Sequence, residues 1–100
     1  MGQPVDGGPT AAWLVPLDGA RRGASMKLDR TTTVGGPRAE LVITDDDVLV
    51  TITISAGGCV ATSDSLYGFW VNDRRSYQVT LDDHDLIQVG DTRVRFMMIS

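Results

Sequence analysis

Hydrophobic and polar residues alternate with a period of two along much of this chain. The segment 48–54 would place Val48, Val50, Ile52 and Ile54 on one face, and Leu49, Thr51 and Thr53 on the other. The segment 92–98 repeats the pattern, with Val94, Phe96 and Met98 opposite Arg93, Arg95 and Met97. Such alternation predicts strands with one buried face.

Eight further apolar or β-branched segments are separated by residues that favour turns, and none shows a helical period. The predicted strands are 12–17, 25–28, 31–34, 41–43, 48–54, 59–62, 69–71, 77–81, 86–89 and 92–98. We therefore expect an all-β sandwich or barrel of about ten to eleven short strands. Its core would contain Trp13, Val15, Leu41, Ile43, Val50, Ile52, Ile54, Trp70, Ile87, Val89, Val94 and Phe96.

Length, charge and cysteine content narrow the class of protein. The 100 residues suffice for one small domain, and we expect a loose leader at 1–11 followed by this domain at 12–98. The net charge of −4 argues against nucleic acid or an anionic membrane as a partner, because both attract clustered positive charge. No apolar run approaches the roughly 20 residues of a membrane span, so we expect no membrane insertion. The single cysteine, Cys59, excludes an intrachain disulfide and favours a cytoplasmic location.

The motifs within residues 12–98 occur in an order that resembles the forkhead-associated (FHA) domain. In chain order they are AWLVPLDGARRGASMKL, VGG, LVITDDD, VLVTITI, SLYGFWVN and LDDHDLIQVGDTRVRF. The last two carry the most specific agreement, through Gly68, Val71, Asn72, Asp85, Ile87, Gly90 and Phe96. The resemblance implies an FHA-like β-sandwich of the SMAD/FHA type. It also implies that the chain is a domain of a larger bacterial signalling or secretion-system protein.

The resemblance further implies a ligand site, because FHA domains bind phosphothreonine peptides through loops at one end of the sandwich. Three of the family's ligand-contacting residues are replaced in this chain. Gly36 stands in place of the arginine of a Gly-Arg pair, and Tyr67 and Phe69 stand in place of an asparagine and a threonine. Ser65 matches the family's serine in this loop.

The family's Ser-x-x-His motif falls within VLVTITI in one of two registers. The serine and histidine correspond either to Val48 and Thr51 or to Leu49 and Ile52. In both registers an aliphatic side chain replaces the hydroxyl that would contact the phosphate. Because a phosphate dianion needs a cluster of cations, hydroxyls or amide donors, the resemblance implies the fold but argues against the family's usual ligand.

Two hypotheses about function follow. The first is a degenerate FHA-like module that binds a protein without phosphothreonine recognition, in trans or in an attached domain in cis, with self-association as a further option. Its binding surface would include Gly36, Arg38, Val48, Leu49, Thr51, Ser65, Tyr67 and Phe69. An exposed apolar patch at Val48, Leu49, Tyr67 and Phe69 would support it. The alternative is a phosphopeptide site rebuilt from Arg38, Ser65 and Thr51, which requires these side chains to converge. A simpler interpretation buries Phe69 or Trp70 in the core and leaves Tyr67 at the loop tip.

Other reactive residues have structural explanations. The acidic runs 45–47 and 82–85 lack the glycine-centred spacing of cation-binding loops, so we expect solvated turns, no metal site and no cofactor. His84 is the only histidine, and no nucleophile elbow accompanies it. Cys59 is expected to point into the sandwich as a small apolar residue. We therefore expect no catalytic residues and no enzymatic activity.

Overall fold

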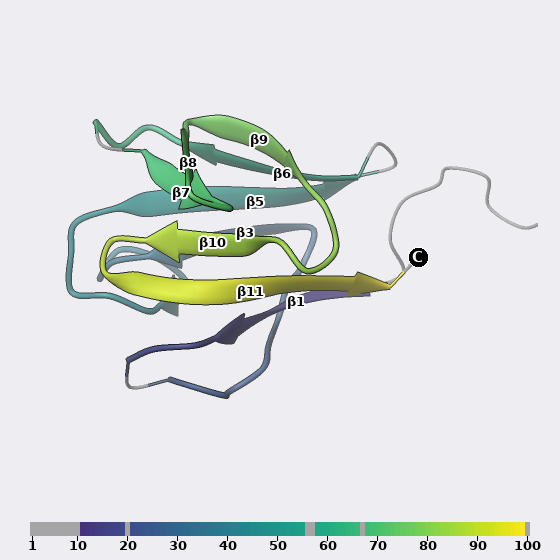
Figure 1. The fold of residues 1–100 in the computed structure, drawn as a ribbon, viewed down its shortest axis with the longest axis horizontal. Coiled ribbons are helices and arrows are strands. Elements are labelled where there is room, and N and C mark those ends of the chain that lie inside the picture. Colours follow the sequence, from purple (N-terminus) through teal and green to yellow (C-terminus); the bar gives the residue numbers. More distant parts are fainter. Residues whose placement is uncertain (1–10, 20, 56–57, 67, 100) are drawn as a thin grey trace, which may run out of the picture.

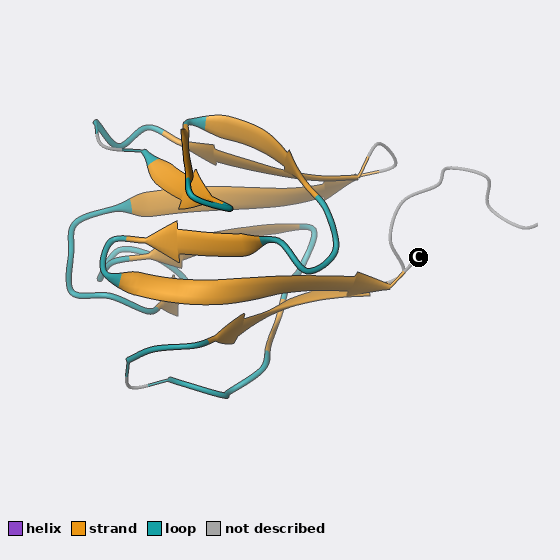
Figure 2. Ribbon diagram, viewed as in Figure 1, coloured by secondary structure: helices purple, strands orange, loops and turns teal. Residues whose placement is uncertain are grey.

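The computed structural model describes residues 11–19, 21–55, 58–66 and 68–99, which form eleven strands and no helix. The strands are β1 (Ala11–Pro16), β2 (Met26–Lys27), β3 (Thr31–Gly35), β4 (Leu41–Val42), β5 (Leu49–Ser55), β6 (Gly58–Ser63), β7 (Phe69–Val71), β8 (Arg74–Ser76), β9 (Gln78–Leu81), β10 (Leu86–Val89) and β11 (Thr92–Ile99). Figure 2 shows strands and loops alone in the described part of the chain. The predicted all-β fold is thereby confirmed. No helix among the described residues is long and apolar enough to cross a membrane.

The strands form two sheets. One has six strands in the order β2-β1-β11-β10-β7-β8, and the other has five in the order β4-β3-β5-β6-β9. Every pairing is antiparallel except that of β3 with β4. The predicted leader at 1–11 falls outside the described residues except for Ala11, which belongs to β1 opposite Ile99.

The loops that follow β1, β3, β4, β6 and β10 gather at one end of the sandwich, on the left in Figure 1. We call this the loop end. The turn between β9 and β10, which contains His84, lies at the opposite end.

The core lies between the two sheets and is made of alternate residues from most strands. Its largest fully buried side chains include Phe69, Phe96, Leu14, Ile52, Leu81 and Ile87. Of the predicted core, Ile43, Val50, Ile52, Ile87, Val89, Val94 and Phe96 are buried, and Leu41 and Ile54 pack against it while partly exposed. Cys59 is also fully buried, as predicted. Burial of such side chains contributes about 1.5–3 kcal/mol each relative to exposure, which makes this alternation the main determinant of the fold.

Two strands have the opposite orientation from the one predicted. In β1, Ala12, Leu14 and Pro16 face inward, while Trp13 and Val15 lie on the outer face. The phase is set by pairing with β11, which places Leu14 directly opposite the buried Phe96. In β7, Phe69 is fully buried and Trp70 is 42% exposed. Both strands are apolar on both faces, so alternation alone could not choose between them.

Strand β8 is absent from the predicted strands, because its sequence Arg-Arg-Ser offers no apolar residue. A two-residue turn creates it, since Val71 pairs with Arg74 and only Asn72 and Asp73 lie between them. Both have positive φ angles, of 50° and 69°. Such angles define a type I′ hairpin turn, for which asparagine and aspartate are well suited. The turn places Arg75 opposite Trp70 on the outer face of the six-stranded sheet.

Candidate functional site

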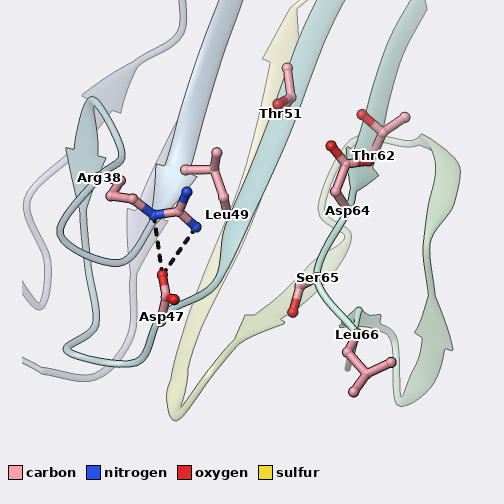
Figure 3. Close-up of a pocket in the computed structure, with 8 residues that line it drawn as sticks. All are labelled: Arg38, Asp47, Leu49, Thr51, Thr62, Asp64, Ser65 and Leu66. Atoms are coloured by element: carbon pink, nitrogen blue, oxygen red, sulfur yellow. Dashed lines mark hydrogen bonds and ion pairs between the residues drawn. The ribbon is translucent and has the colours of Figure 1, made fainter.

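A cavity of about 350 Å³ opens at the loop end, and we call it the loop-end pocket. It is lined by Arg38, Asp47, Leu49, Thr51, Thr62, Asp64, Ser65 and Leu66. Leu49 and Thr51 belong to β5, Thr62 belongs to β6, and the remaining residues come from the three loops around them (Figure 3). The pocket therefore brings together four of the predicted surface residues, namely Arg38, Leu49, Thr51 and Ser65.

Among the described residues that line this pocket, the only cation is bound to a carboxylate. Nη2 of Arg38 lies 3.0 Å from Oδ1 of Asp47, and Nε of Arg38 donates to the same oxygen at 3.2 Å. Figure 3 shows the guanidinium turned toward Asp47, with Asp64 and Ser65 on the opposite side of the pocket. The lining thus contains one guanidinium and two carboxylates, a net charge of −1. This balance disfavours a phosphate dianion.

The position at which the resemblance would place a phosphate-contacting arginine is closed by backbone packing. The N–H of Gly36 donates to the carbonyl oxygen of Val48 at 2.8 Å. A Cβ atom on Gly36 would lie 2.1 Å from the carbonyl oxygen of Asp46, and one on Gly35 would lie 2.2 Å from that of Val48. Gly35 also has a φ of +146°, which L side chains rarely adopt. A side chain at position 36 therefore requires the segment 46–48 to move.

Strand β5 shows which of its first residues can face a ligand. Val48 is 7% exposed and belongs to the core, whereas Leu49 lines the pocket. The serine of the family's Ser-x-x-His motif would fall at Val48 or at Leu49, and of these two positions only Leu49 lines the loop-end pocket. Val48, which the predicted binding surface includes, is largely turned into the core by this alternation and does not line the loop-end pocket.

Of the two aromatic residues in the predicted surface, the structure places only Phe69. Phe69 is 0% exposed, because β7 turns it into the core, so it cannot contact a partner. Tyr67 lies outside the described residues. Gly68 has a φ of +66°, and a Cβ atom there would lie 2.4 Å from the carbonyl oxygen of Ser76, so this turn requires glycine.

Leu66 is the exposed apolar residue of this loop that sequence reasoning missed. It is 79% exposed, and its carbonyl oxygen accepts a hydrogen bond from the Tyr77 hydroxyl at 3.0 Å. The loop is also connected to β5, because the Ser63 hydroxyl donates to the carbonyl oxygen of Leu49 at 2.8 Å and the Ser65 N–H donates to Ser63 Oγ at 3.1 Å. An apolar residue within a segment predicted to be a turn is the feature of the sequence that could have identified Leu66.

A second, larger cavity of about 640 Å³ lies next to the first, and we call it the Trp70 groove. Its lining residues are Asp46, Asp47, Val48, Ser65, Gly68, Trp70, Gln88, Gly90 and Asp91. Asp47 and Ser65 line both cavities. The two cavities are therefore neighbours at the same end of the sandwich.

A hydrogen-bond network holds one wall of the Trp70 groove. The Thr44 hydroxyl donates to Asp91 Oδ1 at 2.8 Å, and the Thr92 hydroxyl lies 3.2 Å from the same oxygen. The hydrogen bond from Thr44, followed by that from Thr92, holds the pKa of Asp91 below its ordinary value. Thr44 is buried and also accepts from the Asp46 N–H at 3.2 Å. This network ties the β4–β5 loop to the β10–β11 turn.

His84 lies away from this end, and Cys59 is buried in the core. Nδ1 of His84 lies 3.1 Å from Oδ2 of Asp83, and both side chains are substantially exposed at the opposite end. Burial raises the pKa of the Cys59 thiol, which disfavours a reactive thiolate. Among the described residues, no group of three or more His, Cys, Asp or Glu side chains is arranged to hold a metal ion.

The sequence matches no protein-family model and no curated protein. Its structure does resemble solved structures. One, described as a study of phosphothreonine-dependent FHA domain interactions, has a TM-score of 0.76 and 21% identity over 91% of this chain and 99% of that chain. An FHA domain from Chlamydia trachomatis has a TM-score of 0.75 and 24% identity over 91% and 100% of the two chains. Mycobacterium tuberculosis EmbR in complex with a low-affinity phosphopeptide has a TM-score of 0.71 and 22% identity over 90% of this chain and 25% of that one. The chain has the fold of the forkhead-associated domains.

Proposed function

We propose that this domain is a protein-interaction module that binds its partner at the loop end without recognising phosphothreonine. The observation that carries the proposal is the packing at Gly36, where a Cβ atom would lie 2.1 Å from the Asp46 carbonyl oxygen. The fold and its loop end are those of FHA domains, but the position for a phosphate-contacting arginine has no room for a side chain. The partner is a protein in trans or an attached domain in cis.

The electrostatics of the pocket support the same proposal. A bound phosphate would approach the Asp47 and Asp64 carboxylates, while Arg38 is already bound to Asp47. Both partners of this ion pair are largely exposed, at 68% and 82%, so the pair itself contributes little to stability. It does offset the one positive charge that a phosphate would use. A phosphopeptide would have to displace Asp47 and accept the repulsion of Asp64.

The apolar contacts available at the loop end suit an unmodified peptide or protein surface. Leu66 is 79% exposed, and Leu49 is partly exposed at the base of the pocket. Two leucines beside hydroxyls of Thr51, Thr62 and Ser65 form a mixed apolar and polar surface, as in many protein interfaces. Burying Leu66 in a partner would gain about 1.5–3 kcal/mol.

Calorimetric titration with an oriented phosphothreonine peptide library and its unphosphorylated twin tests the proposal. We expect the two libraries to bind alike or the phosphorylated one to bind more weakly. Leu66→Asp should weaken binding of the unphosphorylated library, and Leu66→Met is the matched control that keeps an apolar side chain. Micromolar binding confined to phosphorylated peptides would overturn the proposal.

A second candidate function is favoured by one specific observation. Arg38, Thr51 and Ser65 all line the loop-end pocket, as a rebuilt phosphopeptide site requires. This site would work only if Arg38 left Asp47. Asp47→Asn should then strengthen phosphopeptide binding and Arg38→Ala should abolish it, whereas under the main proposal neither variant creates a preference for phosphate.

A further inference from the structure

The Trp70 groove contains a partly exposed aromatic side chain. Trp70 is 42% exposed on the outer face of the six-stranded sheet, between Gln88 of β10 and Arg75 of β8. Gln88 lines the groove with it, whereas the Arg75 guanidinium lies 5.8 Å from the centre of the Tyr77 ring. A large exposed tryptophan in a groove is a common anchor point of protein interfaces.

The charges of the residues that line the groove determine which type of ligand suits it. Asp46, Asp47 and Asp91 line the groove, and no cation is among the described residues that do so. Asp47 is compensated by Arg38. Asp46 and Asp91 therefore leave a net negative charge among the described residues that line the groove. This combination is complementary to a cation that can also contact an aromatic ring.

Of these carboxylates, that of Asp91 is held in place before any ligand binds. Asp91 accepts hydrogen bonds from the Thr44 and Thr92 hydroxyls, at 2.8 and 3.2 Å. Asp46 lies against the β10–β11 turn, where a Cβ atom on Gly90 would be 2.6 Å from its Oδ2 atom. The glycine thus gives this carboxylate its space. Preorganisation of this kind reduces the entropy lost on binding.

We propose that the Trp70 groove binds an arginine side chain of the protein partner, with the guanidinium beside the indole and hydrogen-bonded to Asp46 or Asp91. Arginine fits better than lysine, because its planar guanidinium stacks on aromatic rings and donates two parallel hydrogen bonds to a carboxylate. This inference rests on the proposed function, since Asp47 and Ser65 line both cavities and one peptide could therefore occupy both.

Titration of the domain with the peptide Ac-GARAG-amide, followed by NMR, tests the assignment. The chain has two tryptophans, Trp13 and Trp70, so the indole N–H signal of Trp70 can be assigned with Trp70→Phe. We expect a saturable shift of this signal that weakens as salt is raised. The matching peptide with citrulline in place of arginine keeps the shape and removes the charge, and it should bind at least threefold more weakly.

Three variants separate the groove from general charge effects. Trp70→Ala and Asp46→Asn should each weaken arginine-peptide binding about two- to fivefold, as expected for exposed cation–π and ion-pair contacts. Asp73→Asn removes one carboxylate in the turn at the other end of β7 and should leave binding unchanged. The spectrum of each variant reports whether it is folded.

The outcomes distinguish this inference from the proposed function. Equal binding of the arginine and citrulline peptides, or equal weakening by Asp73→Asn and Asp46→Asn, would overturn the arginine site. If unphosphorylated library peptides still bound and Leu66→Asp weakened their binding, the proposed function would stand although the arginine site would not. Binding confined to phosphothreonine peptides would overturn both.

Discussion

Replacing Gly36 by alanine should destabilise the domain although alanine is small. The new Cβ would lie 2.1 Å from the Asp46 carbonyl oxygen, about 1.3 Å closer than ordinary contact. The segment it meets is held by the hydrogen bonds from Gly36 N–H to Val48 and from Val48 N–H to Asp46, at 2.8 and 2.9 Å. Overpacking costs about 1–3 kcal/mol, and loss of one of these bonds adds about 0.5–1.5 kcal/mol.

One favourable contribution must be subtracted from this loss of stability. Alanine lowers the conformational entropy of the unfolded chain, which stabilises the folded state by about 0.4–1 kcal/mol. The expected loss is therefore about 2–3 kcal/mol, which in a domain of this size lowers the Tm by roughly 10–20 °C. Thermal and urea unfolding, followed by circular dichroism, would measure it.

Gly23→Ala is the matched control for this prediction. Gly23 has a φ of +80°, and a Cβ atom there would meet nothing within 4 Å, whereas Gly36 has no positive φ and a close contact. The control should lose only about 1 kcal/mol, from conformational strain. If Gly36→Ala proved as stable as Gly23→Ala, the argument that packing closes position 36 would be refuted. For the same reason Gly36→Arg should lose stability without gaining micromolar affinity for phosphothreonine peptides.

Three further predictions test the core, the network and the thiol. Phe69→Ala should cost about 3–5 kcal/mol in urea unfolding and Trp70→Ala less than about 1 kcal/mol, and equal costs would contradict the orientation of β7. The pKa of Asp91 lies below its ordinary value of 3.8. Ionised Asp91 therefore stabilises the folded state above about pH 3.8, and this stabilisation is lost as the pH falls through the pKa of the folded state. The Tm difference between the parent and Asp91→Asn should therefore shrink below about pH 4, and a constant difference would exclude the carboxylate as its cause. Cys59 should react with a thiol reagent at the rate of unfolding, and immediate reaction in the native state would contradict its burial.

How much of the fold the sequence predicts depends on how different the two faces of each strand are. In β5 the inner face is aliphatic and the outer face includes two threonines, so both the strand and its orientation are predicted correctly. In β1 both faces are apolar, and only pairing with β11 decides that Leu14 rather than Trp13 faces inward. Strand β8 has no apolar residue, and it forms because the turn at Asn72 and Asp73 brings it beside β7. Both failures concern contacts that lie outside the segment itself.

In the candidate site, too, one part follows from the sequence and the other depends on contacts between separate segments. The resemblance indicates which loops lie together, and four of the residues it selects, Arg38, Leu49, Thr51 and Ser65, line one pocket in the structure. The remaining lining residues depend on strand register, as with Thr62, which joins the pocket because it pairs with Thr51 across β5 and β6. The ion pair of Arg38 with Asp47 could not be predicted either, because alternation and turn signals do not place two side chains from different loops.

The loop end has an FHA-type backbone and carries a net negative charge. The packing of one segment, 46–48, underlies both. The residues lining its two cavities carry four carboxylates, on Asp46, Asp47, Asp64 and Asp91, against the single guanidinium of Arg38, a net charge of −3. The whole chain carries −4. The segment 46–48 accounts for three features of the loop end. Its carbonyl groups close position 36, Asp47 binds Arg38, which is the only cation among the described residues lining these cavities, and Asp46 lines the Trp70 groove. A side chain at position 36 would displace this segment and with it both carboxylates. The packing that leaves no room for a Cβ atom at position 36 is therefore the same packing that holds two carboxylates at the loop end, and under the proposed function their negative charge disfavours a phosphate.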